Sequence, residues 1–533
     1  MTEKLKRWSN RVEAARSWDW AVLALFVALV TLVSAHHEPW RDEAQAWLLA
    51  RDMNLWDLVT QQLRYEGHTP LWYLLLAIPA KLGVPYELGL KTVSLTVAAL
   101  SAALLIRRSP FPWFARYTLP FTYFLFFQFT VVNRSYCLVV LFMWLAAMCF
   151  HSRNRRPWRY AAILAALGGV SAHGMLFGAG FALSWLLEMA VAERKTGKGW
   201  IARLLRDGRF HALLAYAAAM LVFVAILWPP ADRYTYGVIL NYGGLRPLYA
   251  LVVAPLDAFI SDVAVGFALG APWYTGLLPA VTCLLGLAAL GVYFHRKKLL
   301  HVAVLSYLPF TLFLGFVYLG LYHLGLYAVW LVCLMWVAMS GPAGERRTSD
   351  GMPERLRRPW RALGPLAYAA VLAVQLVWTA SASIHEIQLP FEAGRAEAQY
   401  IQANGIDGRR IMNQYDFNEA FGQVYTDQVV SVLPYFNRNI FYNFNDGDPD
   451  RSYNPFRVPT GREPEQWRAQ GPPEFYLENF FHRIEDYPDI LNAEDYVVIA
   501  SFSYHHLWKG IMDSYTDRLY ARKDIAGPFL NGQ

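Results

Sequence analysis

The chain has 533 residues, of which 56% are hydrophobic and only 17% charged, and its formal net charge is +7. This composition excludes an ordinary soluble enzyme, because the apolar residues come in runs long enough to cross about 30 Å of hydrocarbon. The charge does not indicate a nucleic-acid partner, since the basic residues fall in short clusters between apolar runs. All four cysteines lie inside apolar runs, so neither a disulfide framework nor a zinc finger can be built from them.

Eleven apolar segments are predicted to span a membrane as helices, and the first follows a basic N-terminus as a retained anchor. With these spans, every later basic cluster, including the one at 345–361, falls on the side of the N-terminus, as the positive-inside rule requires. The C-terminus is then external. The predicted spans are 18–35, 87–106, 113–132, 135–150, 160–173, 175–191, 210–228, 276–294, 301–319, 323–340 and 362–381.

One further apolar segment, Pro70 to Leu82, would reverse every later loop if it crossed the membrane. It is short and holds two prolines, so we expect an interfacial or re-entrant helix that remains part of the first external loop.

The first external loop, residues 36–86, concentrates acids and histidines. From Asp42 onward its pattern predicts an amphipathic helix in the membrane interface, with Asp42 as the N-cap. A solvated loop with a capping aspartate is the simpler interpretation, but the clustering between two apolar segments favours a site. The loop contributes Glu38, Asp42, Glu43, Asp52, Asp57, Glu66, His36, His37 and His68.

Four other external turns also carry a basic or imidazole side chain. A single histidine near a helix end is usually satisfied by its surroundings. Ionisable groups at membrane depth are costly, however, and usually face a cavity. The cytoplasmic loops hold no phosphate-binding glycine loop, so any chemistry is expected outside. The four residues are Arg134, His173, Arg246 in the loop 229–274, and His323.

The region 383–533 differs from the rest, because Asn, Asp, Tyr and Phe replace the Leu, Ala and Val runs. Short alternating patterns predict a small external α/β domain, with a helix at 393–403 and strands at 409–413, 439–442 and 495–500. The chain therefore divides into a membrane domain, 1–382, and this C-terminal domain.

Three short motifs resemble those of the GT-C superfamily of membrane glycosyltransferases, most closely the branch of protein O-mannosyltransferases and lipid A aminoarabinose transferases. They are Asp42-Glu43, the stretch Glu66 to Tyr73 (EGHTPLWY), and the stretch Asn133 to Tyr136. The resemblance covers about residues 18–190 and implies a GT-C-like fold in a bacterial inner membrane, with the C-terminal domain extracytoplasmic. It also implies that a sugar moves from a polyprenyl-phosphate carrier to a glycan, lipid or protein acceptor.

Chemical roles follow for the residues of the external face. A displacement at the sugar needs a carboxylate that takes the acceptor's proton, and cations that hold the leaving phosphate. We assign Asp42 as the base and Glu43 as its helper or orienting residue. Arg134 is the first choice for the phosphate, and further candidates are His173, His323 and Arg246. Glu66 and His68 are expected to position the sugar or to hold a divalent metal ion.

Two other classes of protein remain as alternatives. A transporter or flippase of a lipid-linked sugar often shows internal repeats and broken spans in matched positions, and the sequence shows neither. A non-catalytic membrane scaffold would explain the spans but not the acids gathered at one face. The transferase is therefore the preferred hypothesis.

Overall fold

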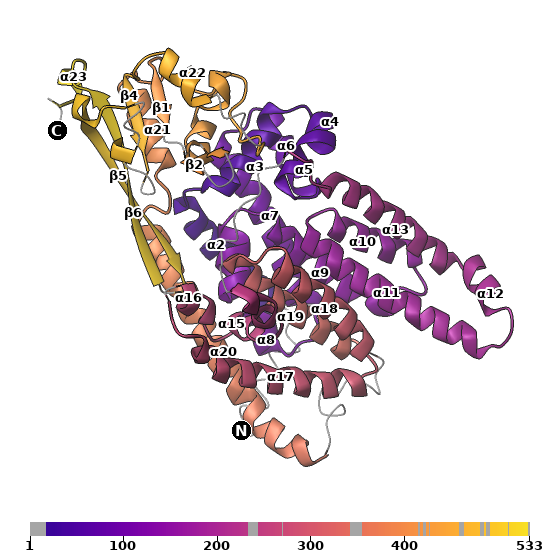
Figure 1. Ribbon diagram of the computed structural model, residues 1–533. Helices are drawn as coiled ribbons and strands as arrows, with labels where there is room; N and C mark the ends of the chain where they lie inside the picture. The colour runs from indigo at the N-terminus through magenta and orange to yellow at the C-terminus, as the bar shows by residue number, and fades with distance from the viewer. Residues whose placement is uncertain are drawn as a thin grey trace.

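The computed structural model describes residues 17–232, 243–268, 270–341, 354–413, 416–418, 423–425, 427–457, 463–479, 484–486, 491–509 and 511–530. It shows a bundle of helices with a small sheet-containing domain at one end (Figure 1). The basic N-terminal segment, part of the loop 229–274 and part of the basic segment 345–361 lie outside the described residues.

Among the described residues, seven helices are long and apolar enough to cross a membrane, a finding compatible with an integral membrane protein. Each coincides with one of the predicted spans. Their outer faces carry exposed leucines, such as Leu278 and Leu285. The seven are α2 (Ser17–His36), α7 (Tyr86–Arg108), α11 (Ala172–Lys195), α13 (Gly208–Leu227), α17 (Leu277–Arg296), α19 (Gly325–Met339) with the turn before it, and α20 (Glu354–Gln388).

The other four predicted spans are shorter or broken. Three of them form short helices, α9 (Tyr136–Cys149), α10 (Pro157–Gly168) and α18 (Leu300–Phe316). The segment predicted as a single span at 113–132 is divided into α8 (Trp113–Thr118), a 3-10 turn and the π-helix η3 (Phe124–Val131). Pro120 lies in that turn, where its missing N–H cannot continue a helical ladder.

The first loop folds into a series of short helices beside the bundle. Helix α6 (Leu71–Lys81) has 11 residues. It is therefore about 16 Å long, too short to cross the hydrocarbon layer. This length agrees with the expectation of a helix that does not span. The others are α3 (Arg41–Asp52), which packs against α6, α4 (Leu55–Asp57), the π-helix η1 (Leu58–Gln62) and α5 (Leu63–Glu66).

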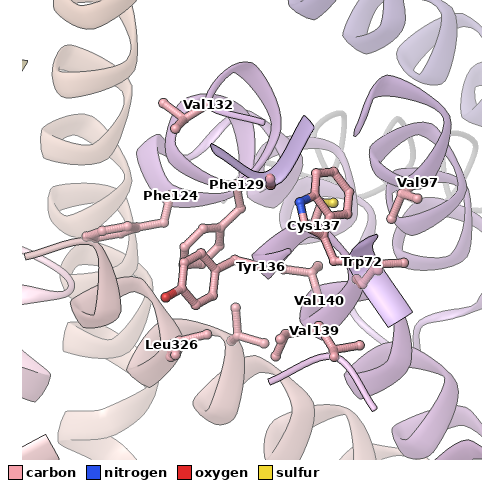
Figure 2. Close-up of a cluster of buried hydrophobic side chains, with 14 of the residues drawn as sticks. Trp72, Val97, Phe124, Phe129, Val132, Tyr136, Cys137, Val139, Val140 and Leu326 are labelled. Atoms are coloured by element: carbon pink, nitrogen blue, oxygen red, sulfur yellow. The ribbon is translucent and has the colours of Figure 1, made fainter. Parts of the chain in front are cut away.

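The core of the bundle is built around α9, which packs against α7, α10 and α19. Figure 2 shows the rings of Phe129 and Tyr136 side by side in this core, and their centroids are 5.5 Å apart. Cys137 and Val140 also belong to this buried cluster. This aromatic packing fixes the start of α9, and Arg134 lies two residues before the first residue of that helix.

The C-terminal domain contains a four-stranded sheet in the order β1-β4-β6-β5. β1 and β4 are parallel, whereas β4–β6 and β5–β6 are antiparallel. The predicted strand at 495–500 is the start of a much longer one, and the segment predicted as a strand at 439–442 makes only an isolated bridge from Phe441 to Ile411. The strands are β1 (Ile411–Asn413), β4 (Phe475–Glu478), β5 (Tyr496–Trp508) and β6 (Ile511–Arg522), with β2 (Asp416–Asn418) and β3 (Gln423–Tyr425) as a separate pair.

Short helices complete the described chain. They connect the longer helices or cover the sheet, and α21 matches the helix predicted at 393–403. They are α12 (Trp200–Arg206), α14 (Arg246–Val252), α15 (Ala254–Asp257), α16 (Val263–Ala268), α21 (Gly394–Ala403), α22 (Glu463–Ala469) and α23 (Gly527–Leu530).

The β5–β6 hairpin reaches from the sheet toward α16 and α20 (Figure 1). Near its tip, Lys509 is buried and donates from Nζ to the backbone carbonyls of Asp257 and Ser261, at 2.5 and 3.1 Å. Its ammonium also lies 4.5 Å from the ring of Trp378 in α20. The hairpin therefore anchors the C-terminal domain to the helical bundle.

Candidate functional site

Helix α3 holds two neighbouring acids in different environments. Trp40 occupies the N-cap position and α3 begins at Arg41, so the expectation that Asp42 is the N-cap is wrong. Asp42 lies instead in the first turn, where the helix dipole favours a negative charge. The side chain of Asp42 is 29% exposed, whereas that of Glu43 is fully buried.

Arg134 is the direct partner of Asp42. Its Nη2 lies 3.0 Å from Asp42 Oδ2, and the guanidinium stacks 4.3 Å from the ring of Tyr322 and 5.4 Å from that of Tyr136. Its second terminal nitrogen, Nη1, is buried and has no hydrogen-bond partner within the described ranges. The side chain therefore holds a donor that is available to an anion.

The charges of this pair are well defined. Burial would raise the pKa of Asp42, but the positive charges of Arg134 and Arg41, and the neighbouring His68, together hold it below its usual range. Burial would lower the pKa of Arg134, but Asp42 raises it above its usual range. At neutral pH the site therefore contains a carboxylate and a guanidinium.

Two histidines lie behind Arg134. His323 Nδ1 accepts a hydrogen bond from the N–H of Gly320 at 2.8 Å, so its Nε2 donates to the hydroxyl of Tyr136, also at 2.8 Å. The ring centroid of His173 is 4.4 Å from that of His323. Both nitrogens of His173 are buried without a hydrogen-bond partner in the described part of the chain. His173 can therefore bind a ligand group without losing a bond to the protein.

The segment from Glu66 to His68 forms another wall. Glu66 Oε1 accepts hydrogen bonds from Gln45 and Gln62, at 3.0 and 3.2 Å. Gly67 follows with φ +72° and ends α5. Residues other than glycine rarely adopt this left-handed backbone conformation. His68 comes next and lies near Tyr73, with 6.4 Å between the ring centroids.

Glu66 and His68 were expected to position the sugar or to hold a divalent metal ion. Across the described residues, no group of three or more His, Cys, Asp or Glu side chains is arranged to hold a metal ion. Glu66 is instead held by amide groups, an arrangement that orients its second carboxylate oxygen.

Glu43 is surrounded by hydrogen-bond donors. Its Oε1 accepts from the backbone N–H of Asn133 at 2.6 Å and from the side-chain amide of Asn133 at 2.8 Å. Its Oε2 accepts from the N–H of Trp40 at 3.1 Å and from His37 Nε2 at 3.0 Å. With both oxygens used in a buried place, Glu43 fits the expected orienting role and not contact with a substrate.

Arg246 is bonded elsewhere in the bundle. Arg246 begins α14 and donates from Nε to the carbonyl of Gly315 at 2.7 Å. This bond joins α14 to α18, and among the described residues no contact links Arg246 to Asp42 or Arg134, so its role as a phosphate ligand stays a prediction. Asp42, Arg134, His68 and His173 share one neighbourhood. Asp42 pairs with Arg134 and has His68 near it, and the ring centroid of His173 is 6.3 Å from that of Tyr136, which flanks Arg134.

No role was assigned from the sequence to the tyrosines beside Arg134, although Tyr136 closes the motif Asn133 to Tyr136. Tyr136 and Tyr322 flank the guanidinium of Arg134, and the hydroxyl of Tyr322 lies 2.6 Å from that of Tyr318. Tyr136 comes two residues after Arg134, and Tyr322 comes directly before His323. That proximity in the sequence was a usable signal.

Comparison with known proteins gives no further information, because the chain matches no protein-family model, no curated protein and no solved structure.

Proposed function

We propose that the protein is a glycosyltransferase of GT-C type that moves a sugar from a polyprenyl-phosphate carrier to an acceptor at the external face of a membrane. The observation that carries this proposal is the buried guanidinium of Arg134, which lies beside the ionised carboxylate of Asp42. Among the described residues, its Nη1 has no hydrogen-bond partner. A phosphate is the anion that a planar guanidinium fork binds best.

The location of the site supports a lipid-borne substrate. Arg134 lies between η3 and α9, at the end of two apolar helices, and Asp42 of α3 pairs with it. By the positive-inside rule this end of the bundle is external. A carrier lipid in the bilayer would present its phosphate at this depth, with its hydrocarbon chain among the helices.

The proposed reaction is a single displacement at the anomeric carbon of the sugar. The acceptor hydroxyl attacks this carbon, its proton passes to a carboxylate oxygen of Asp42, and the bond between the carbon and the phosphate oxygen breaks. Polyprenyl phosphate leaves with the bonding electrons, and Arg134 stabilises its charge. Because the pKa of Asp42 is held low, the carboxylate is a weak base, so we do not expect proton transfer before the bond to the phosphate begins to break.

Binding of the carrier is the first test. The purified protein is placed in nanodiscs with undecaprenyl phosphate, and phosphatidic acid serves as the lipid that offers a phosphate without a prenyl chain. We expect selective binding of undecaprenyl phosphate, and we expect Arg134→Lys to weaken it about tenfold or more, because lysine cannot form the two-pronged contact.

A matched control comes from Arg116 at the other end of the bundle. It is also buried, donates to the carbonyl of Ile106 and stacks near Tyr117. Arg116→Lys should leave the affinity unchanged. Equal affinities of wild type and Arg134→Lys would reject the proposed phosphate site, and a loss of lipid-free thermal stability in Arg134→Lys alone would identify Arg134 as a structural partner of Asp42.

A further inference from the structure

A second, fully buried chain of charged groups lies behind the Asp42–Arg134 pair. His37 bridges two carboxylates: its Nε2 lies 3.0 Å from Glu43 Oε2, and its Nδ1 lies 2.8 Å from Glu386 Oε1. The side chains of His37, Glu43 and Glu386 are completely shielded from solvent. Glu386 belongs to α20, whose end leads into the C-terminal domain.

The chain ends on the residue next to Arg134. Glu43 accepts both the backbone and the side-chain N–H of Asn133, and it is itself the neighbour of Asp42. Asp42 therefore directly precedes Glu43, and Arg134 directly follows Asn133, so both residues of the candidate site adjoin this hydrogen-bonded network. A shift of Glu43 must move Asp42 and the Asn133–Arg134 backbone relative to each other.

The geometry requires His37 to carry a positive charge. Each ring nitrogen faces a carboxylate oxygen, and with both carboxylates ionised each must donate a hydrogen, which only the imidazolium can do. Burial opposes this charge, but Glu43 and Glu386 outweigh it and raise the pKa of His37 to about 10. A group with a raised pKa contributes its stabilising interaction at low pH and loses it as the pH rises through the raised value.

We propose that His37 and Glu386 are positioning residues of the phosphate site, and that they hold Arg134 in register with Asp42 through Glu43 and Asn133. The proposal rests on the proposed function. Glu386 at the end of α20, far from Arg134 in the sequence, then controls the affinity for the carrier phosphate. Neither residue touches the substrate.

The other charged groups around His37 do not take over this role. Arg395 of α21 donates to the backbone carbonyl of His37 at 3.3 Å, but its guanidinium is paired with Glu87 and Glu38. Glu392 lies near Glu38, Glu43 and Arg41, and burial raises its pKa to about 7. Burial raises the pKa of Glu38 to about 6. Removing Glu386 therefore leaves His37 with Glu43 as its bonded carboxylate.

The test is the pH dependence of undecaprenyl phosphate binding in nanodiscs for the wild type and Glu386→Gln. Glutamine keeps the shape and can accept the hydrogen bond from Nδ1, but it removes one of the two charges that raise the pKa of His37. The ratio of the two dissociation constants cancels the titration of the lipid phosphate. We expect a ratio near one at about pH 6 and a rise to about tenfold at about pH 9, where the variant loses one charge-assisted hydrogen bond.

Two further variants separate positioning from folding. Glu386→Asp keeps the charge and should restore the flat ratio between about pH 6 and pH 9. Glu188→Gln is the matched control, because Glu188 also accepts from a histidine, His301 Nε2 at 2.8 Å, on helices α11 and α18. It should bind undecaprenyl phosphate with wild-type affinity at every pH.

The outcomes are distinct. A ratio for Glu386→Gln that stays at one throughout overturns the positioning role, as does a ratio that is raised equally at every pH together with a lower thermal midpoint. If Glu386→Gln does not fold, the same measurement is made on His37→Gln. A dissociation constant equal to that of the wild type at every pH would then overturn the positioning role. If the wild type binds no undecaprenyl phosphate, the proposed function itself fails.

Discussion

At the scale of single residues, the site consists of one ion pair whose members come from distant parts of the chain. The sequence allowed Asp42 and Arg134 to be singled out, because acids in a loop between apolar spans and an arginine between two aromatic spans are both unusual. It did not predict that they pair at 3.0 Å, nor that Glu43 binds Asn133. Such pairings depend on how helices pack, which local patterns do not contain.

Replacement of Asp42 tests the proposed base. Asp42→Asn keeps the size of the side chain but removes its basicity, so transfer should fall by about 10²–10⁴-fold while undecaprenyl phosphate still binds. The measurement is turnover of the lipid-linked donor by the purified variant, with thermal stability as a control. Near-normal turnover would leave Asp42 as a partner of Arg134 only.

The pH profile of transfer follows from the electrostatics of Asp42. A carboxylate whose pKa is lowered in the folded protein stays ionised, and its pairing with Arg134 persists, until the pH falls through that lowered value. The acid limb of the rate profile should therefore lie below the range in which an ordinary aspartate titrates. An acid limb at or above about pH 5 would point to a different, higher-pKa base.

Glu43 is predicted to matter for stability more than for chemistry. In Glu43→Gln one carboxylate oxygen becomes an amide that faces donors, and His37 loses a counter-charge in a fully buried place. We expect a loss of about 3–5 kcal/mol of unfolding free energy, measured by thermal or denaturant unfolding. The exposed control Glu494→Gln should change it little. Normal stability with lost turnover would instead place Glu43 in the reaction.

At the scale of elements, hydropathy located the helices well but not their continuity. The expected third span is divided by Pro120 and continues as the π-helix η3, and this break places Arg134 beside α3. Sequence alternation found only the first part of β5, because the rest of the strand carries large polar and aromatic side chains. The tip of the hairpin, where Lys509 has φ +52°, was not expected at all.

The hairpin anchor has a measurable consequence. Lys509→Met keeps most of the side-chain length but leaves the carbonyls of Asp257 and Ser261, and the carboxylate of Asp262, without this cation. We expect a cost of about 1–3 kcal/mol and faster hydrogen exchange across β5 and β6, with the helices of the bundle unaffected. Unchanged exchange in the two strands would show that the domain is held by its other contacts.

At the scale of the whole molecule, the described residues form seven long apolar helices, several shorter ones and a C-terminal domain that contacts α3. Composition predicted the membrane class, and the lengths of the helices agree with it. The sidedness follows only from the basic loops. It determines whether the site faces the outside.

Sidedness can be measured by labelling introduced cysteines, since all four native cysteines are buried. Ala403 and Thr196 are both exposed, the first in the C-terminal domain and the second after α11. With an external C-terminal domain, a membrane-impermeant thiol reagent should label Ala403→Cys in intact cells and spare Thr196→Cys until the membrane is permeabilised. The reverse pattern would place the site on the cytoplasmic side.

The most direct measurement of the central claim is a map of the protein in nanodiscs with undecaprenyl phosphate. The account predicts phosphate density within hydrogen-bond distance of Arg134 Nη1 and next to His173, with Asp42 facing the side from which an acceptor would arrive. Lipid phosphate bound only elsewhere, with the Arg134–Asp42 pair unchanged, would contradict the account.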